Sequence, residues 1–227
     1  MTDIIFCRSH CYPVCCRASQ LGFLYGLRSD DLRYCGMCKI DFIDIDFKRP
    51  DTEKHRAAVL QFAPKYATVL DVMEGHQLVH ALDMARVFSK SGVLPILIPK
   101  IQCIHEIPKQ YILGYSIPTT YGYTALSTSA FAGRRLHLLG GTPKQQAEYY
   151  RHFIGLGCEI VSLDCNSVAK AAGHGTVWRD RYRREWYNDG LHKAYVKTLM
   201  LSLENVWNFW QEILADPTRG QLEMDVI

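Results

Sequence analysis

The stretch from residue 133 to residue 167 constrains the fold more than any other part of the sequence. Apolar segments at 136–139 and 160–163 flank a polar segment that begins like a helix, with Thr142 as the capping residue and Pro143 at the first helical position. A strand, a helix and a second strand of these lengths form a βαβ unit, in which the two strands are parallel. This stretch therefore predicts a parallel sheet.

The same alternation runs through most of the chain. Seven strands are predicted, and nearly all are followed by a helix, which implies an all-parallel sheet with helices outside. With seven or eight such units, a closed βα barrel of the TIM type is favoured over an open sheet, although 227 residues is near the short end for that fold. We therefore predict a single α/β domain, 1–227, folded as a small and irregular barrel.

The predicted strands are 4–7, 39–47, 68–72, 93–99, 111–117, 136–139 and 160–163. The predicted helices include 51–63, 76–90, 127–132 and 190–213. Residues 26–31 are assigned to a loop and a helix start because of their glycine and their paired acids.

The composition is that of a globular protein. Apolar residues make up 48% of the chain and charged residues 22%. No window approaches 18 uncharged apolar residues, so we expect no membrane span. The N-terminus lacks the basic and apolar segments of a signal peptide, so the nine cysteines are expected to be reduced thiols in the cytoplasm.

The cysteines near the N-terminus raise the question of a zinc site. Cys35 and Cys38 have metal-ligand spacing, and a tetrahedral site would need two further ligands. The spacing between the pair Cys35 and Cys38 and the possible ligands at 10–16 fits no common zinc finger. The alternative to a metal site is therefore a set of small buried thiols. The available further ligands are His10, Cys11, Cys15 and Cys16.

Acidic residues end several of the predicted strands. Asp164 directly follows an apolar run, Asp71 lies near the end of its strand, and Asp44 and Asp46 share one strand face by alternation. The carboxyl ends of parallel strands are where functional groups gather, so these acids are candidates for a polar site. Each case has an alternative. Asp164 could instead cap the next helix, and Asp44 and Asp46 could instead lie on the solvent-exposed face of an edge strand.

The segment 176–197 accounts for the net charge of the protein. It has six Lys or Arg residues against three acids, a surplus equal to the net charge of +3. Its arginines alternate with aromatic residues, and guanidinium groups suit phosphate oxygens while rings stack on exposed bases. We predict that 176–213 is a basic, aromatic helical extension; a solvated helix face whose aromatic residues pack on the barrel is the alternative. The predicted contacts to a nucleic-acid backbone are Lys48, Arg49, Arg179, Arg181, Arg183 and Arg184.

Four motifs in the same order resemble the tRNA-guanine transglycosylase superfamily. LLGGTPK at 138–144 and IVSLDC at 160–165 are similar to that family's MGVGTPE and DMFDC. Upstream, ILGYSIPTTYG at 112–122 occupies the place of IGGxxxGE, and VLDVME at 69–74 is similar to the segment around FDE. The resemblance covers about 40–167.

This resemblance implies a βα barrel in which Asp164 is the nucleophile on the anomeric carbon of a nucleotide and Asp71 reads the base. The family's zinc motif after the nucleophile is absent, since only Cys165 follows Asp164. The family's Gly-Gly pair is replaced by Gly114-Tyr115-Ser116, which implies a different base or no incoming base. These departures make the chain look closer to the DNA-directed relatives of the superfamily.

The chemistry expected from these residues is cleavage of an N-glycosidic bond. A carboxylate beneath C1′, assigned to Asp164, stabilises or attacks the sugar, and a second acid, Asp71, Asp44 or Asp46, protonates the departing base. This chemistry needs no metal ion and no cofactor. A Gly-Gly turn before a helix could alternatively bind a phosphate. The residues expected to bind the substrate are Asp44, Ser116, Tyr115, Tyr121, Gly140, Gly141 and Asn166.

The expected function is that of a DNA glycosylase that removes a modified base, such as a hypermodified cytosine in phage DNA, and leaves an abasic site. Base exchange in DNA or tRNA with a 7-deazaguanine-type base is the first alternative. A barrel that binds nucleic acid without catalysis is the second. DNA is the expected partner and RNA the alternative; the oligomeric state is left open.

Overall fold

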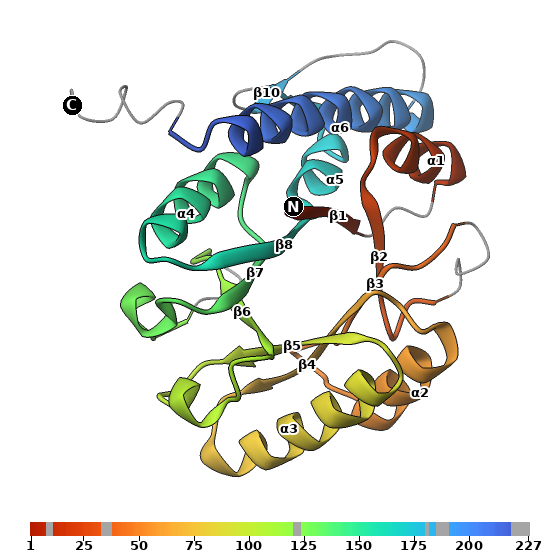
Figure 1. Ribbon diagram of the computed structural model, residues 1–227. Helices are drawn as coiled ribbons and strands as arrows, with labels where there is room; N and C mark the ends of the chain where they lie inside the picture. Colours follow the sequence, from red (N-terminus) through yellow and green to blue (C-terminus); the bar gives the residue numbers. More distant parts are fainter. Residues whose placement is uncertain (8–10, 33–37, 120–123, 180–181, 185–190, 219–227) are drawn as a thin grey trace.

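A closed barrel of eight parallel strands forms the centre of the molecule (Figure 1). The computed structural model describes residues 1–7, 11–32, 38–119, 124–179, 182–184 and 191–218. Each strand pairs with the next in sequence, and β8 closes the ring by pairing with β1. The predicted TIM-type α/β barrel is thereby confirmed. The strands are β1 Asp3–Cys7, β2 Leu24–Arg28, β3 Phe42–Asp44, β4 Tyr66–Val72, β5 Leu94–Pro99, β6 Ile112–Ser116, β7 Arg135–Leu139 and β8 Glu159–Cys165.

Strand β2 corrects the prediction of a loop at residues 26–31. Gly26 lies in the middle of this strand, where a Cβ atom would stand 2.6 Å from Cys7 Sγ and 2.9 Å from a ring carbon of Phe42. The glycine is therefore present for close packing inside the barrel and not for a turn. Strand β3 is also shorter than the predicted 39–47.

The helices surround the barrel unevenly. Short 3₁₀ helices, instead of α-helices, follow β5 and β6; the second lies within the short helix predicted at 127–132. Within the described residues, no helix is both long and apolar enough to cross a membrane. The helices are α1 Tyr12–Leu21, α2 Thr52–Phe62, α3 Gly75–Lys90, α4 Pro143–Gly155, α5 Ser167–Ala172 and α6 Leu191–Ala215; the 3₁₀ turns are η1 Ile104–Glu106 and η2 Thr128–Phe131.

The C-terminal part differs from the predicted helical extension. Strands β9 Thr176–Trp178 and β10 Tyr182–Arg184 form an antiparallel pair before α6 begins. The predicted packing stripe of α6 is confirmed, because Leu199, Leu203, Val206 and Trp210 are all buried. This helix packs against α1 and α5, so it covers the barrel instead of extending from it (Figure 1).

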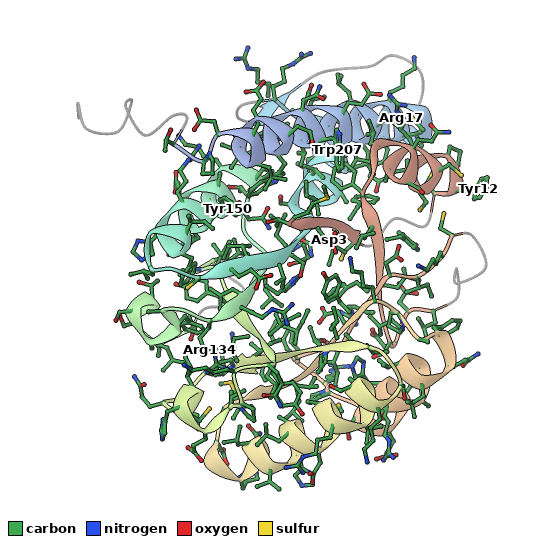
Figure 2. All side chains as sticks on the ribbon, viewed as in Figure 1. Asp3, Tyr12, Arg17, Arg134, Tyr150 and Trp207 are labelled. Carbon is green, nitrogen blue, oxygen red and sulfur yellow. The ribbon has the colours of Figure 1, made fainter. Side chains whose placement is uncertain are left out.

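Specific contacts hold α6 to its neighbours. The ring of Trp207 of α6 lies tilted against that of Phe23, with the ring centroids 5.1 Å apart. Glu204 accepts two hydrogen bonds from Arg17 of α1, where the two helices meet (Figure 2). On the other side, the ring of Trp210 meets Tyr150 of α4 at 5.8 Å.

The side chains inside the barrel follow the two-residue repeat of the strands. In β5 the inward row is Ile96, Ile98 and, just past the strand, Lys100; in β6 it includes Ile112 and Ser116. The apolar members of these rows form a cluster of their own, separate from the larger core between strands and helices. The rows change from apolar to polar toward the carboxyl ends, so they form an apolar floor beneath a cavity that polar side chains enter.

Gly114 offers a direct test of this interior packing. A Cβ atom there would stand 2.6 Å from Leu139 Cδ1 and 2.8 Å from Ile98 Cγ1, so Gly114→Ala is expected to lower the free energy of unfolding by about 1–3 kcal/mol, measured by urea denaturation. Gly75→Ala is the matched control because nothing lies within 4 Å of its Cβ position. Equal stability of the two variants would contradict the packing described.

Candidate active site

A cavity of about 650 Å³ lies at the carboxyl ends of the barrel strands. Period-two alternation explains its composition: Asp44, Ser116 and Asp164 continue the inward rows of their strands. The structure brings together eight of the ten residues predicted for catalysis or substrate binding. These are Asp44, Asp46, Asp71, Ser116, Gly140, Gly141, Asp164 and Asn166.

Asp164 is held firmly at the wall of the cavity. It is 8% exposed, and its Oδ1 accepts a hydrogen bond of 2.8 Å from the backbone N–H of Gly140. The side-chain amide of Gln146 donates to the carbonyl oxygens of both Asp164 and Gly140, at 2.5 and 2.9 Å, which ties the β7 loop to the end of β8. The residue at the N-cap of α5 is Asn166, so the alternative in which Asp164 caps that helix is wrong.

A neutral histidine lies beside Asp164 inside the barrel. His137 is fully buried, its ring stacks on Phe42, and its Nδ1 lies 2.8 Å from Ser162 Oγ. Its Nε2 lies 3.8 Å from Asp164 Oδ1. Burial lowers the pKa of His137 to about 3, so the ring is neutral near pH 7 and Asp164 has no cationic partner in it.

A second carboxylate, Asp71, shares the cavity with Lys100. The Lys100 Nζ atom lies 3.7 Å from Asp71 Oδ2 and donates a hydrogen bond of 2.6 Å to Ser116 Oγ. Desolvation raises the pKa of Asp71, against the opposing effect of Lys100. Desolvation also lowers the pKa of Lys100, against the opposing effect of Asp71. Both groups therefore shift toward their neutral forms.

Lys100 was not among the predicted site residues, although the sequence contained the signal. It stands two residues after Ile98 and four after Ile96 in the inward row of β5. The same alternation excludes Tyr115 from the cavity, because the next residue, Ser116, faces inward and successive side chains of a strand point to opposite sides.

Asp44, the last residue of β3, and Asp46, just past it, have their own partners. Asp44 Oδ1 accepts a hydrogen bond of 2.9 Å from Thr68 Oγ1, and Asp46 is paired with Arg28 at 3.1 Å. Asp46 also accepts a hydrogen bond from the backbone N–H of Lys48. Asp71 is the better candidate to donate a proton, because desolvation raises its pKa.

Some predicted residues lie elsewhere. Tyr115 is buried against Phe131, Tyr149 and Phe153 on the outside of the barrel, so the prediction that it stacks on a base in the cavity is wrong. Trp178 is also buried, against α6, and is not available for stacking. Tyr121 lies outside the described residues.

The predicted backbone-binding residues are dispersed. Lys48 and Arg49 are exposed just past Asp46, which lines the cavity. Arg179 and Arg183 are exposed in and beside the β9–β10 hairpin; Arg184 ends β10. Arg181 lies outside the described residues.

The N-terminal cysteines do not form a recognisable metal centre in the part of the chain that the structure describes. No group of three His, Cys, Asp or Glu residues there is arranged to hold a metal ion, and the described cysteines form no disulfide. His10 and Cys35, two of the ligands considered above, lie outside the described residues.

The loop that holds Asp164 depends on the start of α4. The Thr142 side chain accepts a hydrogen bond from the backbone N–H of Gln145, and Gln145 Oε1 accepts one from the backbone N–H of Thr142. Thr142→Ala is expected to lower the free energy of unfolding by about 1 kcal/mol in a thermal or urea melt. Thr142→Ser retains the cap and is the control; equal losses in both variants would show that the cap is not responsible.

Comparison with known proteins places the chain in a family. Residues 18–211 match a family model described as "Family of unknown function (DUF6610)". The chain belongs to this family. A search of curated proteins found no match to the sequence.

Solved structures share the barrel of this DUF6610 member. A crystal structure reported as a "putative fructose-1,6-biphosphate aldolase" from Coccidioides immitis has a TM-score of 0.63 and 12% sequence identity, with 98% of this chain and 94% of that chain covered. A truncated 3-deoxy-D-arabino-heptulosonate 7-phosphate synthase from Thermotoga maritima has a TM-score of 0.49 and 12% identity, with 95% and 88% covered. At 12% identity, the similarity to the first structure shows a shared fold alone. The TM-score of the second is too low to show a shared fold.

Proposed function

We propose that this protein is an enzyme that cleaves the N-glycosidic bond of a nucleotide in DNA, with Asp164 as the nucleophile at C1′. The observation that carries the proposal is the position of Asp164: it is nearly buried, held by the Gly140 N–H, and faces a cavity that also contains the proton-donating candidate Asp71. Two carboxyl groups in different environments are the arrangement that glycosidic bond cleavage requires. The resemblance to tRNA-guanine transglycosylases assigns the same role to Asp164.

The different surroundings of the two acids suit two different roles. Asp164 accepts a backbone hydrogen bond from Gly140, whereas desolvation raises the pKa of Asp71 and favours its protonated form. As the bond between C1′ and the base nitrogen breaks, its electron pair moves onto the base, which takes a proton from Asp71. Asp164 forms an ester with C1′, and water then releases the abasic sugar.

The cavity and its rim suit a single flipped nucleotide. A volume of about 650 Å³ lies in the usual range for sites that enclose a small molecule. A base in a duplex must leave the stack to reach such a site, and this costs least for a modified or mispaired base. Lys48 and Arg49 are exposed next to the cavity, where they are placed to contact phosphates. We therefore propose a modified base, such as a hypermodified cytosine of phage DNA, as the substrate.

Mass spectrometry of small molecules released from a panel of nucleic acids tests the proposal. The panel holds plain DNA, phage DNA with hypermodified cytosines, DNA with 7-deazaguanine, and bulk tRNA, each incubated with the wild-type protein. We expect a free base from one of the DNA substrates and a matching abasic site.

Two other results would each contradict the proposal in a different way. Uptake of a labelled free base into the polymer, without net formation of abasic sites, would establish base exchange. Binding of nucleic acid with neither release nor uptake would favour a barrel that binds without catalysis.

A further inference from the structure

Lys100 has surroundings that the cleavage step proposed above does not require. Its side chain is only 9% exposed, yet it lines the cavity together with Asp71 and Ser116. The side chains of Ile98 and Leu139 also line this cavity, so Lys100 is surrounded in part by apolar groups. A buried lysine whose pKa is lowered by desolvation has a larger fraction of the neutral amine, which is the nucleophilic form.

A second lysine of the cavity provides a comparison. Lys170 also lines the cavity, from α5, but it is exposed. Burial therefore distinguishes Lys100 from Lys170 within one cavity. The carboxyl group of Asp71, 3.7 Å from Lys100 Nζ, lies where it can exchange a proton with that amine.

We propose that Lys100 forms an imine with the C1′ aldehyde of an abasic sugar, so that the protein is also an abasic-site lyase. This proposal rests on the proposed function, because base release produces the abasic sugar in the same cavity. Lys100 follows β5 and Asp164 lies on β8, and both face that cavity. The abasic sugar opens to a flexible aldehyde, which removes the ring constraint that holds C1′ beside Asp164.

The proposed step balances in atoms and electrons without any further reactant. The neutral amine of Lys100 attacks C1′, and the carbinolamine loses one water molecule to give the imine, with Asp71 protonating the departing hydroxyl. A base then removes a proton from C2′. The electron pair of the broken C2′–H bond forms a C2′=C3′ double bond as the C3′–O bond to the 3′-phosphate breaks; this β-elimination cuts the strand and leaves the C1′ imine in place. Water finally hydrolyses the imine and regenerates the Lys100 amine.

Reductive trapping on DNA with a pre-formed abasic site tests the proposal separately from base release. The full-length protein is mixed with a single-stranded oligonucleotide carrying one abasic site, sodium borohydride is added, and covalent complexes are resolved on a denaturing gel. We expect a borohydride-dependent complex with the wild-type protein, and peptide mapping is expected to place the adduct on Lys100. We expect Lys100→Met and Lys100→Arg to reduce trapping at least about a hundredfold, while Lys90→Met, the control at an exposed lysine of α3 outside the cavity lining, remains close to the wild type.

Each outcome decides between the two proposals. The absence of trapping with the wild-type protein, or an adduct that maps to another residue, would overturn the lyase proposal whatever the base-release assay shows. Trapping on Lys100 without release of a base from any nucleic acid would sustain the lyase and count against the proposed glycosylase. If circular dichroism shows that the Lys100 variants do not fold, the residue that carries the adduct in the wild-type protein decides whether Lys100 forms the imine.

Discussion

Asp164→Asn is expected to abolish base release while the barrel stays folded. The asparagine carbonyl oxygen still accepts the hydrogen bond that the Gly140 N–H donates to Asp164 Oδ1 at 2.8 Å, and the side chain has nearly the same volume. The amide has no negative charge to stabilise C1′ and is a poor nucleophile. Loss of a reacting group of this kind lowers rates by about 10³-fold or more.

Single-turnover kinetics with the DNA that releases a base measures this effect. Asp83→Asn is the matched control, because Asp83 is exposed on α3 and pairs only locally with Arg86. Circular dichroism melts of both variants verify folding. A rate for Asp164→Asn within a few-fold of the Asp83→Asn rate would remove Asp164 from the reaction.

Acid is expected to destabilise the fold strongly below about pH 6 because two histidines are buried in neutral form. Burial lowers the pKa of His55 to about 4 and that of His137 to about 3, from an ordinary value of 6.5. As pH falls below 6.5, the unfolded chain binds these protons but the folded chain does not, so stability is full above about pH 6.5 and is lost below it. Each histidine contributes roughly 1.4 kcal/mol per pH unit within its window.

Urea denaturation between pH 7.5 and 4.5 measures this dependence. His55→Gln and His137→Gln are each expected to flatten the acid limb by about one proton, although each variant also loses stability at neutral pH. His76→Gln is the control, because His76 is 70% exposed on α3 and is expected to leave the slope unchanged. If the free energy of unfolding falls with pH in both His55→Gln and His137→Gln as steeply as in the wild type, these two histidines do not cause the acid dependence.

Much of the fold follows from hydrophobic periodicity in the sequence. The βαβ unit at 133–167 appears as predicted, with β7, α4 with its Thr142 cap, and β8 in order. Strand β2 was missed because a glycine inside a strand resembles a turn in sequence; its role depends on Cys7 and Phe42, which approach it only in the closed barrel. The β9–β10 pair lies in a segment predicted to be helical. The alternation of aromatic and basic residues there is compatible both with a pair of strands and with the end of a helix.

Much of the candidate site can be predicted from one physical rule, that the carboxyl ends of parallel strands meet at one edge of the sheet. Acids at the ends of parallel strands meet at one edge, and this brought Asp44, Asp71 and Asp164 together as predicted. Strict alternation would also have included Lys100 and excluded Tyr115. The ion pair between Arg28 and Asp46 joins side chains of neighbouring strands, and no local pattern indicates it.

The most direct test of the central claim is a search for the covalent intermediate on Asp164. The wild-type protein is mixed with the DNA that releases a base, quenched in denaturant after less than one turnover, digested and analysed by mass spectrometry. The account predicts a sugar-linked adduct on the tryptic peptide 152–170, at Asp164. Base release with an adduct on a different carboxylate, or with none at any time point, would contradict it.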